Sequence, residues 1–170
     1  MKILIIALPR TGSSNLLFSL AKDKNLIPIF EPFSQLKKND DIIRTYNSND
    51  DNVIVKTIIF QHPDNISLCK EFDEIILLSR KDLLACAESW AYFSKNKING
   101  FGSWLPYVYE GITDTEVKYS LKVLVEYNSL LKQISNTLDV PITYYEDLYD
   151  LSSPNKLRKS NKVELKKNIL

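Results

Sequence analysis

Cationic residues lie at the ends of three apolar runs in this sequence, and a carboxylate follows a fourth. The cations are Arg10, Lys56 and Arg80, and the carboxylate is Glu31. Guanidinium and ammonium groups bind phosphate through charge-assisted hydrogen bonds, and a carboxylate can take the proton of a hydroxyl. These residue types indicate chemistry on an anionic ligand.

The segment 3–16, ILIIALPRTGSSNL, indicates an anion-binding loop. An apolar run stops at Pro9 and a helical pattern follows at once, so a buried strand turns sharply into a helix. Backbone N–H groups and the positive end of the helix dipole then meet at one point, which suits a phosphate. The lysine of a nucleoside-triphosphate P-loop is missing, and an ordinary strand–helix turn is the alternative. The predicted phosphate contacts are Arg10, Thr11, Gly12, Ser13, Ser14 and Asn15.

Strand-like and helix-like segments alternate along the chain. We predict strands over 2–8, 25–30, 53–59, 74–79 and 140–145. We predict helices from 13 to about 24 and from 63 to about 72. Two further helices are predicted from capping boxes. One box, at Ser79 to Asp82, opens a helix after the fourth strand, and the other, at Thr113 and Glu116, opens a helix that ends at about 138. Residues 38–52 are expected to form a loop or short helix, and 99–111 a loop. Pro28 predicts an edge position for the second strand.

This alternation predicts a three-layer α/β fold with a mainly parallel sheet, in one domain over residues 1–170. Such folds bind ligands beyond the carboxyl ends of their strands. The residues expected there are Arg10, Glu31, Lys56 with Thr57, Arg80, and Tyr145 with Glu146.

The composition is that of a globular protein, with 44% hydrophobic and 25% charged residues and a net charge of +1. No apolar run is long enough to span a bilayer, and no signal peptide is evident, so we expect a cytoplasmic protein without a membrane partner. We expect Cys69 and Cys86 to be reduced core thiols, and we expect no metal site. The tail 152–170 is basic, either as a solvated end or as an arm over an anionic ligand. The small basic excess argues against nucleic acid.

Five blocks of this sequence resemble motifs of the sulfotransferases that use 3′-phosphoadenosine-5′-phosphosulfate (PAPS), especially small bacterial and phage-type members. The blocks are LPRTGSSNL, Glu31-Pro32-Phe33, VKT at 55–57, LLSRKDLLACAESW at 77–90 and ITYYEDL at 142–148. The resemblance implies a P-loop-like fold of the sulfotransferase and nucleoside-kinase type. It also implies PAPS as co-substrate, its product 3′,5′-ADP (PAP), no metal, and a hydroxyl of a small molecule or carbohydrate as acceptor, with an amine as the less favoured choice.

The resemblance further implies two phosphate subsites. Residues 10–15 would hold the 5′-phosphosulfate, and Arg80 with Ser89 would hold the 3′-phosphate. Arg80 and Ser89 are one residue farther apart than the corresponding pair in the family, whereas Lys81 and Ser89 match its spacing, so Lys81 is an alternative. In the tail, Arg158 and Lys159 are similar to residues that close over the 3′-phosphate, although the usual glycines are absent.

For catalysis, the resemblance implies Glu31 as the general base, with Lys56 and Arg10 on the departing oxygen. A carboxylate that caps a helix beginning at Pro32 is the alternative for Glu31. Ile58 stands where the cytosolic branch has a histidine, and His62 is a second candidate base.

Aromatic residues are candidates for the acceptor site. We expect Trp104 and Tyr107 to line an acceptor lid, and we expect Trp90 to belong to the core.

Two other functions remain open from the sequence. One is a P-loop kinase-like phosphotransferase that depends on a nucleoside triphosphate and magnesium. The other is a degenerate module that binds PAP or another nucleotide without turnover.

Overall fold

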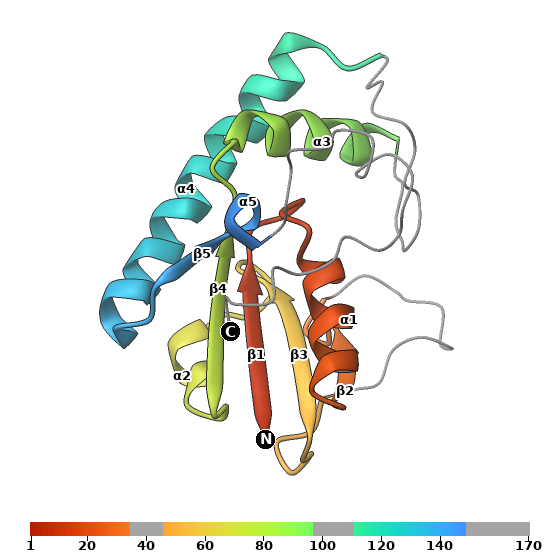
Figure 1. Ribbon diagram of the computed structural model, residues 1–170. Helices are drawn as coiled ribbons and strands as arrows, with labels where there is room; N and C mark the ends of the chain where they lie inside the picture. Colours follow the sequence, from red (N-terminus) through yellow and green to blue (C-terminus); the bar gives the residue numbers. More distant parts are fainter. Residues whose placement is uncertain (35–45, 97–110, 149–170) are drawn as a thin grey trace.

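A five-stranded, all-parallel β-sheet forms the centre of the computed structural model, which describes residues 1–34, 46–96 and 111–148. The strands are β1 (Lys2–Ala7), β2 (Ile27–Phe30), β3 (Val53–Ile58), β4 (Glu74–Ser79) and β5 (Ile142–Tyr144). Their order across the sheet is β2-β3-β1-β4-β5 (Figure 1).

Helices cover both faces of this sheet, which confirms the predicted three-layer α/β architecture. The helices are α1 (Ser13–Asp23), α2 (Asn65–Cys69), α3 (Leu83–Lys95), α4 (Asp114–Leu138) and α5 (Tyr145–Leu148). Helix α1 packs on one face, and α2 and α4 pack on the other. Helix α3 lies beyond the carboxyl ends of β1 and β4 (Figure 1).

Alternate side chains of β1 build two separate hydrophobic cores. Ile3 and Ile5 point into the core under α1, whereas Leu4 and Ile6 point into the core under α2 and α4. All four are fully buried. The uninterrupted apolar run at the start of the sequence therefore reflects a central strand that is covered on both faces.

The predicted edge position of the second strand is confirmed. Strand β2 pairs only with β3 in the described part of the sheet, and Pro28 lies opposite Ile54. Proline cannot donate a ladder hydrogen bond, so an outermost strand tolerates it best. Strand β4 lies between β1 and β5 and is therefore an interior strand.

One of the two predicted capping boxes is correct. Thr113 and Glu116 form a capping box at the start of α4, and the N–H and hydroxyl of Thr113 lower the pKa of the Glu116 carboxyl. The predicted box at Ser79 is wrong. Asp82 caps α3 by accepting from the N–H of Ala85 at 2.9 Å.

Ser79 cannot cap that helix because it is still part of β4. It is fully buried and lies opposite Tyr144 of β5 in the ladder. Its hydroxyl donates to Oδ1 of Asn128 at 3.0 Å, which ties the end of the strand to α4. Pairing with the neighbouring strand outweighs the local capping preference here.

Both cysteines are free and buried, as predicted. Burial raises the pKa of the Cys69 and Cys86 thiols to about 11. In the described part of the chain, no helix is long and apolar enough to cross a membrane.

The topology leads us to expect a ligand-binding crevice at the carboxyl end of β1. The chain leaves β1 toward α1 on one face, whereas it leaves the flanking strands β3 and β4 toward helices on the other face. Loops that depart in opposite directions from adjacent strands leave a gap where α/β proteins bind ligands. The residues after β1, β3 and β4 are therefore the candidate site.

Candidate functional site

The loop after β1 is a tight turn that ends at the start of α1. The Thr11 hydroxyl is buried and donates to the carbonyl of Leu8 at 2.8 Å. Gly12 occupies the N-cap position of α1 with φ of 75°, and as a glycine it has no side chain that could cap the helix. The N-cap residue therefore places no side-chain acceptor on the first turn of α1, which suits an anion site.

Gly12 is required here for two separate reasons. Its positive φ belongs to the left-handed region, which side chains disfavour. A Cβ atom built on Gly12 would also lie 2.6 Å from Cδ2 of Tyr145, and closer still to its Cε2. Tyr145 is the first residue of α5, so the segment after β5 seals directly against the loop after β1.

Arg10 links this loop to α3. Its Nε donates to the hydroxyl of Ser89 at 3.0 Å, and its Cζ lies 3.6 Å from the centre of the Phe93 ring. The backbone carbonyl of Arg10 accepts from the Cys86 thiol at 3.5 Å. The structure thus brings together Arg10 and Ser89, which the sequence assigned to different phosphates of one nucleotide.

Arg80 contacts the segment after β5. Its Nε is 3.4 Å from Oε1 of Glu146, and its Cζ is 5.5 Å from the centre of the Tyr145 ring. Tyr145 therefore contacts both Gly12 and Arg80. Tyr145 thus contacts one residue from each of the two predicted phosphate-binding motifs.

The alternative residue, Lys81, points elsewhere. Its ammonium group pairs with Asp147, and both side chains are more than half exposed. The Arg80 side chain is only 25% exposed and faces the ring that covers the loop after β1. The geometry favours Arg80 as the partner of the predicted 3′-phosphate.

Glu146 holds the segment between β4 and α3 in place. Its carboxylate accepts from the backbone N–H groups of Lys81 at 2.9 Å and Asp82 at 3.3 Å, and it also pairs with Arg80. A single side chain from α5 therefore fixes both the backbone and the guanidinium next to the crevice.

A second cluster lies at the ends of β2 and β3. The ammonium group of Lys56 is almost fully buried, forms an ion pair with Oε1 of Glu31, and lies 4.2 Å from the centre of the Phe30 ring. Oε2 of Glu31 accepts from Nε2 of Gln61 at 2.7 Å. A buried cation is tolerated only with such compensation, so Glu31 and Lys56 form a unit.

The structure does not support the capping role for Glu31. Residues 32–33 form a turn, and the backbone carbonyl of Glu31 accepts from the N–H of Ser34. Its carboxylate faces Lys56 and Gln61 instead.

The backbone is strained at two of the residues predicted to be catalytic, Arg10 and Glu31. Among the described residues other than glycine, φ is positive at Arg10 (62°) and Glu31 (45°), and otherwise at Asn25, Asn52 and Asp139. Asparagine and aspartate tolerate this region, whereas arginine and glutamate do so less readily. Such strained residues cluster at functional sites.

His62 is held by a local turn. Its Nδ1 accepts from the backbone N–H of Asp64 at 3.2 Å, and its ring meets that of Phe33 edge-on at 4.8 Å. Asp64 in turn caps α2 by accepting from the N–H of Ser67. These contacts fit a structural residue before a short helix better than a base.

Three packed aromatic side chains lie next to the cluster of Glu31, Lys56 and Gln61. Phe60, next to Gln61, stacks on Tyr127 of α4 at 5.2 Å and on Trp90 of α3 at 6.4 Å. Trp90 is partly buried against the core, as predicted. A groove of about 490 Å³ opens between α3 and α4 beside Trp90 and Tyr127.

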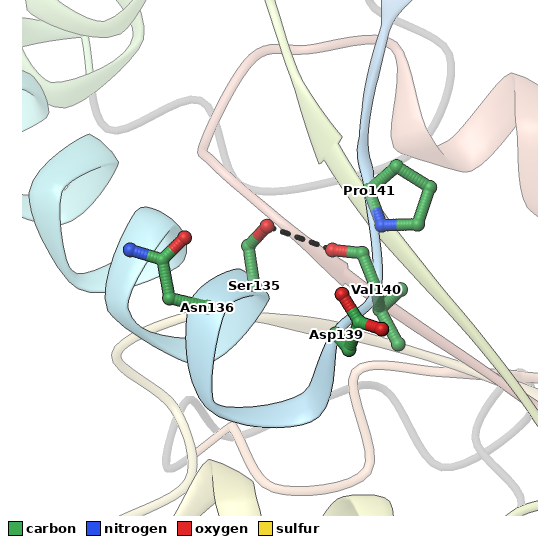
Figure 2. A pocket seen from close by; sticks show the side chains of 5 residues that line it. All are labelled: Ser135, Asn136, Asp139, Val140 and Pro141. Carbon is green, nitrogen blue, oxygen red and sulfur yellow. Dashed lines mark hydrogen bonds between the residues drawn. The ribbon is translucent and has the colours of Figure 1, made fainter.

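Another cavity, of about 290 Å³, lies at the opposite end of the sheet. Figure 2 shows its lining, in which the hydroxyl of Ser135 donates to the carbonyl of Val140 at 2.7 Å. Val140 and Pro141 precede β5, so this cavity adjoins an amino end of the parallel sheet. Its position does not match the crevice expected of the fold.

Several predicted residues fall outside the described part of the chain. They are Trp104, Tyr107, Arg158 and Lys159, together with the rest of the basic tail 152–170. The described residues contain no group of three or more histidine, cysteine, aspartate or glutamate side chains that could hold a metal ion.

Gln61 and Phe93 contact the candidate residues Glu31 and Arg10, and neither was predicted from the sequence. Phe93 lies four residues after Ser89, and this spacing places both on one face of α3. Gln61 lies three residues after the end of β3, and only this short distance from a strand end indicated a role in the site.

Comparison with models of protein families found no match for this chain, and comparison with curated proteins found none either.

Proposed function

We propose that this protein is a PAPS-dependent sulfotransferase with a P-loop-like α/β fold, which transfers a sulfuryl group to a hydroxyl of a small molecule or carbohydrate. The observation that carries the proposal is the hydrogen bond between Arg10 and Ser89, 3.0 Å long, close to the start of α1 with its glycine N-cap. It joins two motifs that resemble the 5′-phosphosulfate and 3′-phosphate subsites of one nucleotide.

The proposed binding mode uses the two sides of the crevice. The 5′-phosphosulfate lies at the start of α1, where the backbone and the Ser13 and Ser14 hydroxyls donate to it. The 3′-phosphate lies between Arg80 and Ser89. Arg10 lies between these subsites, and its guanidinium can donate to either phosphate.

The proposed reaction is an in-line displacement at sulfur. Glu31 takes the proton of the acceptor hydroxyl while the acceptor oxygen forms a bond to sulfur. The bond between sulfur and the bridging oxygen breaks, and its electron pair stays on the phosphate oxygen of PAP. Lys56 and Arg10 stabilise that developing charge, so catalysis depends on positioning and electrostatics.

Cationic side chains suit this reaction without a metal. A sulfuryl group carries less charge than a phosphoryl group, so fixed cations can supply the stabilisation that phosphoryl transfer takes from magnesium. Lys56 is well placed for this role because it is buried, and charge interactions are stronger away from water.

A PAP-binding module without turnover is the second candidate. The observation in its favour is that both oxygens of Glu31 are already engaged, one by Lys56 and one by Gln61. A carboxylate whose two oxygens are both engaged cannot take the proton of an acceptor hydroxyl unless one donor moves away.

Thermal stability with added nucleotide tests the proposal. A ligand at a hundredfold excess over its Kd stabilises the native state by about 2.7 kcal/mol. PAP should raise the melting temperature in the presence of EDTA, and Arg80→Ala should remove the effect. Lys81→Ala is the matched control, and it should respond like the wild type.

The other outcomes assign the protein to the alternatives. Stabilisation by ATP with magnesium but not by PAP would indicate a kinase-like phosphotransferase. Binding of PAP without consumption of PAPS, over a broad panel of acceptors, would indicate the non-catalytic module.

A further inference from the structure

Gln61 connects the end of β3 to the carboxylate of Glu31. Its Oε1 accepts from the backbone N–H of Ile58 at 2.9 Å and from the Thr57 hydroxyl at 3.3 Å. Because a backbone N–H can only donate, Oε1 must face the strand end. Nε2 therefore faces Glu31 and donates to its Oε2 at 2.7 Å.

The two oxygens of Glu31 are held by different kinds of partner. Lys56 contacts Oε1 with a charged group at the end of a flexible side chain. Gln61 contacts Oε2 with an amide whose other end is fixed to the backbone. The Gln61 contact is therefore tied to the backbone, whereas the Lys56 contact depends on one side-chain charge.

This difference matters once a phosphosulfate binds. The reaction proposed above requires the ammonium group of Lys56 at the bridging oxygen of PAPS, and in that position it would no longer contact Oε1 of Glu31. Oε1 could then accept the proton of the acceptor hydroxyl. Glu31 would lose its ion pair with Lys56 at that step, and its backbone already has an unfavourable φ of 45°.

We infer that Gln61 is a positioning residue, which keeps Glu31 in place after Lys56 transfers to the phosphosulfate. The inference rests on the proposed function. Gln61 donates one hydrogen bond to Oε2 and leaves Oε1 to the acceptor. It performs this role from the turn after β3, three residues beyond the strand end.

Nuclear magnetic resonance on the free and PAP-bound protein tests the inference without an acceptor. The side-chain amide signal of Gln61 is assigned as the one lost in Gln61→Glu. PAP should shift the signals of the Lys56 Cε methylene strongly, whereas the Gln61 amide signal should keep its position. A Gln61 signal that moves toward that of a solvated amide on PAP binding would overturn the inference.

Kinetics of two variants separate positioning from a structural role. Gln61→Glu keeps an acceptor for the N–H of Ile58 but cannot donate to Glu31, whereas Gln61→Met removes both bonds. With PAPS and a panel of 4-nitrophenol, ethanolamine and glucosamine, both variants should lose about 100-fold in kcat, as a misplaced catalytic group does. Their KM for PAPS and their affinity for PAP should stay within about twofold of the wild type. Gln133→Met, on the exposed face of α4, is the matched control and should behave as the wild type.

The outcomes distinguish this inference from the proposed function. A wild-type protein that binds no PAP overturns the proposed function, and the inference falls with it. Binding of PAP together with wild-type kcat in Gln61→Glu overturns the inference alone, because Gln61 would then serve only the turn after β3.

Discussion

Replacing Gly12 by alanine tests how tightly the segment after β5 seals the loop after β1. Two costs follow from the structure. The left-handed φ of 75° costs a residue with a Cβ about 1–2 kcal/mol. The new methyl group would also lie 2.6 Å from Cδ2 of Tyr145, and overpacking of this kind costs about 1–3 kcal/mol.

Gly111 provides a matched control for the first of these costs. Its φ is 79°, but a Cβ built there meets no atom of the described residues within 4 Å. Gly111→Ala should therefore lose only the conformational part of the unfolding free energy. Gly12→Ala should lose about 1–3 kcal/mol more, because only Gly12 has the contact with Tyr145.

Urea denaturation of the two variants measures this difference directly. The unfolding free energy and the slope against urea should be determined for both, so that a change in the unfolded state is recognised. Adding Tyr145→Ala to Gly12→Ala should recover part of the loss in a double-mutant cycle. Equal losses in Gly12→Ala and Gly111→Ala would refute the close packing of Tyr145 on this loop.

Three further predictions concern the elements around the site. Glu146→Gln should lower the unfolding free energy by about 1–3 kcal/mol, because its carboxylate serves two backbone N–H groups and a guanidinium, whereas Asp147→Asn should have no measurable effect in the same urea experiment. Cys69 and Cys86 should react far more slowly with a thiol reagent in the native than in the unfolded protein at pH 8. Burial raises their pKa from 9.0 to about 11, so the unfolded thiols lose their protons first and stability should fall as the pH rises above about 9. Thr113→Ala should cost about 1 kcal/mol, measured by urea denaturation, through loss of the cap of α4; an unchanged midpoint would contradict that role.

The sheet could be predicted from the sequence because its strands carry local signals. The apolar runs of β1 and β4 reflect burial on both faces, and Pro28 marks the edge strand. The capping box of Thr113 and Glu116 was equally readable, because both partners lie within one helical turn.

The missed features all depend on contacts between distant parts of the chain. Ser79 fits a capping pattern locally, but pairing of β4 with β5 keeps it in the strand. Gln61 and Glu31 are thirty residues apart, and Glu146 and Lys81 are sixty-five apart. Neither pair has a helical or strand spacing in the sequence, so only the fold brings the two residues of each pair together.

The central claim is that Arg10, Ser89 and Arg80 form one metal-free site for a nucleotide with two separate phosphates. Calorimetric titration with PAP and with 5′-AMP in EDTA tests it most directly, because the two ligands differ only in the 3′-phosphate. We predict that PAP binds at least about tenfold more tightly, which corresponds to about 1.4 kcal/mol, and that Arg80→Ala removes the difference. Equal affinity for both nucleotides in the wild type, or binding only of ATP with magnesium, would contradict the account.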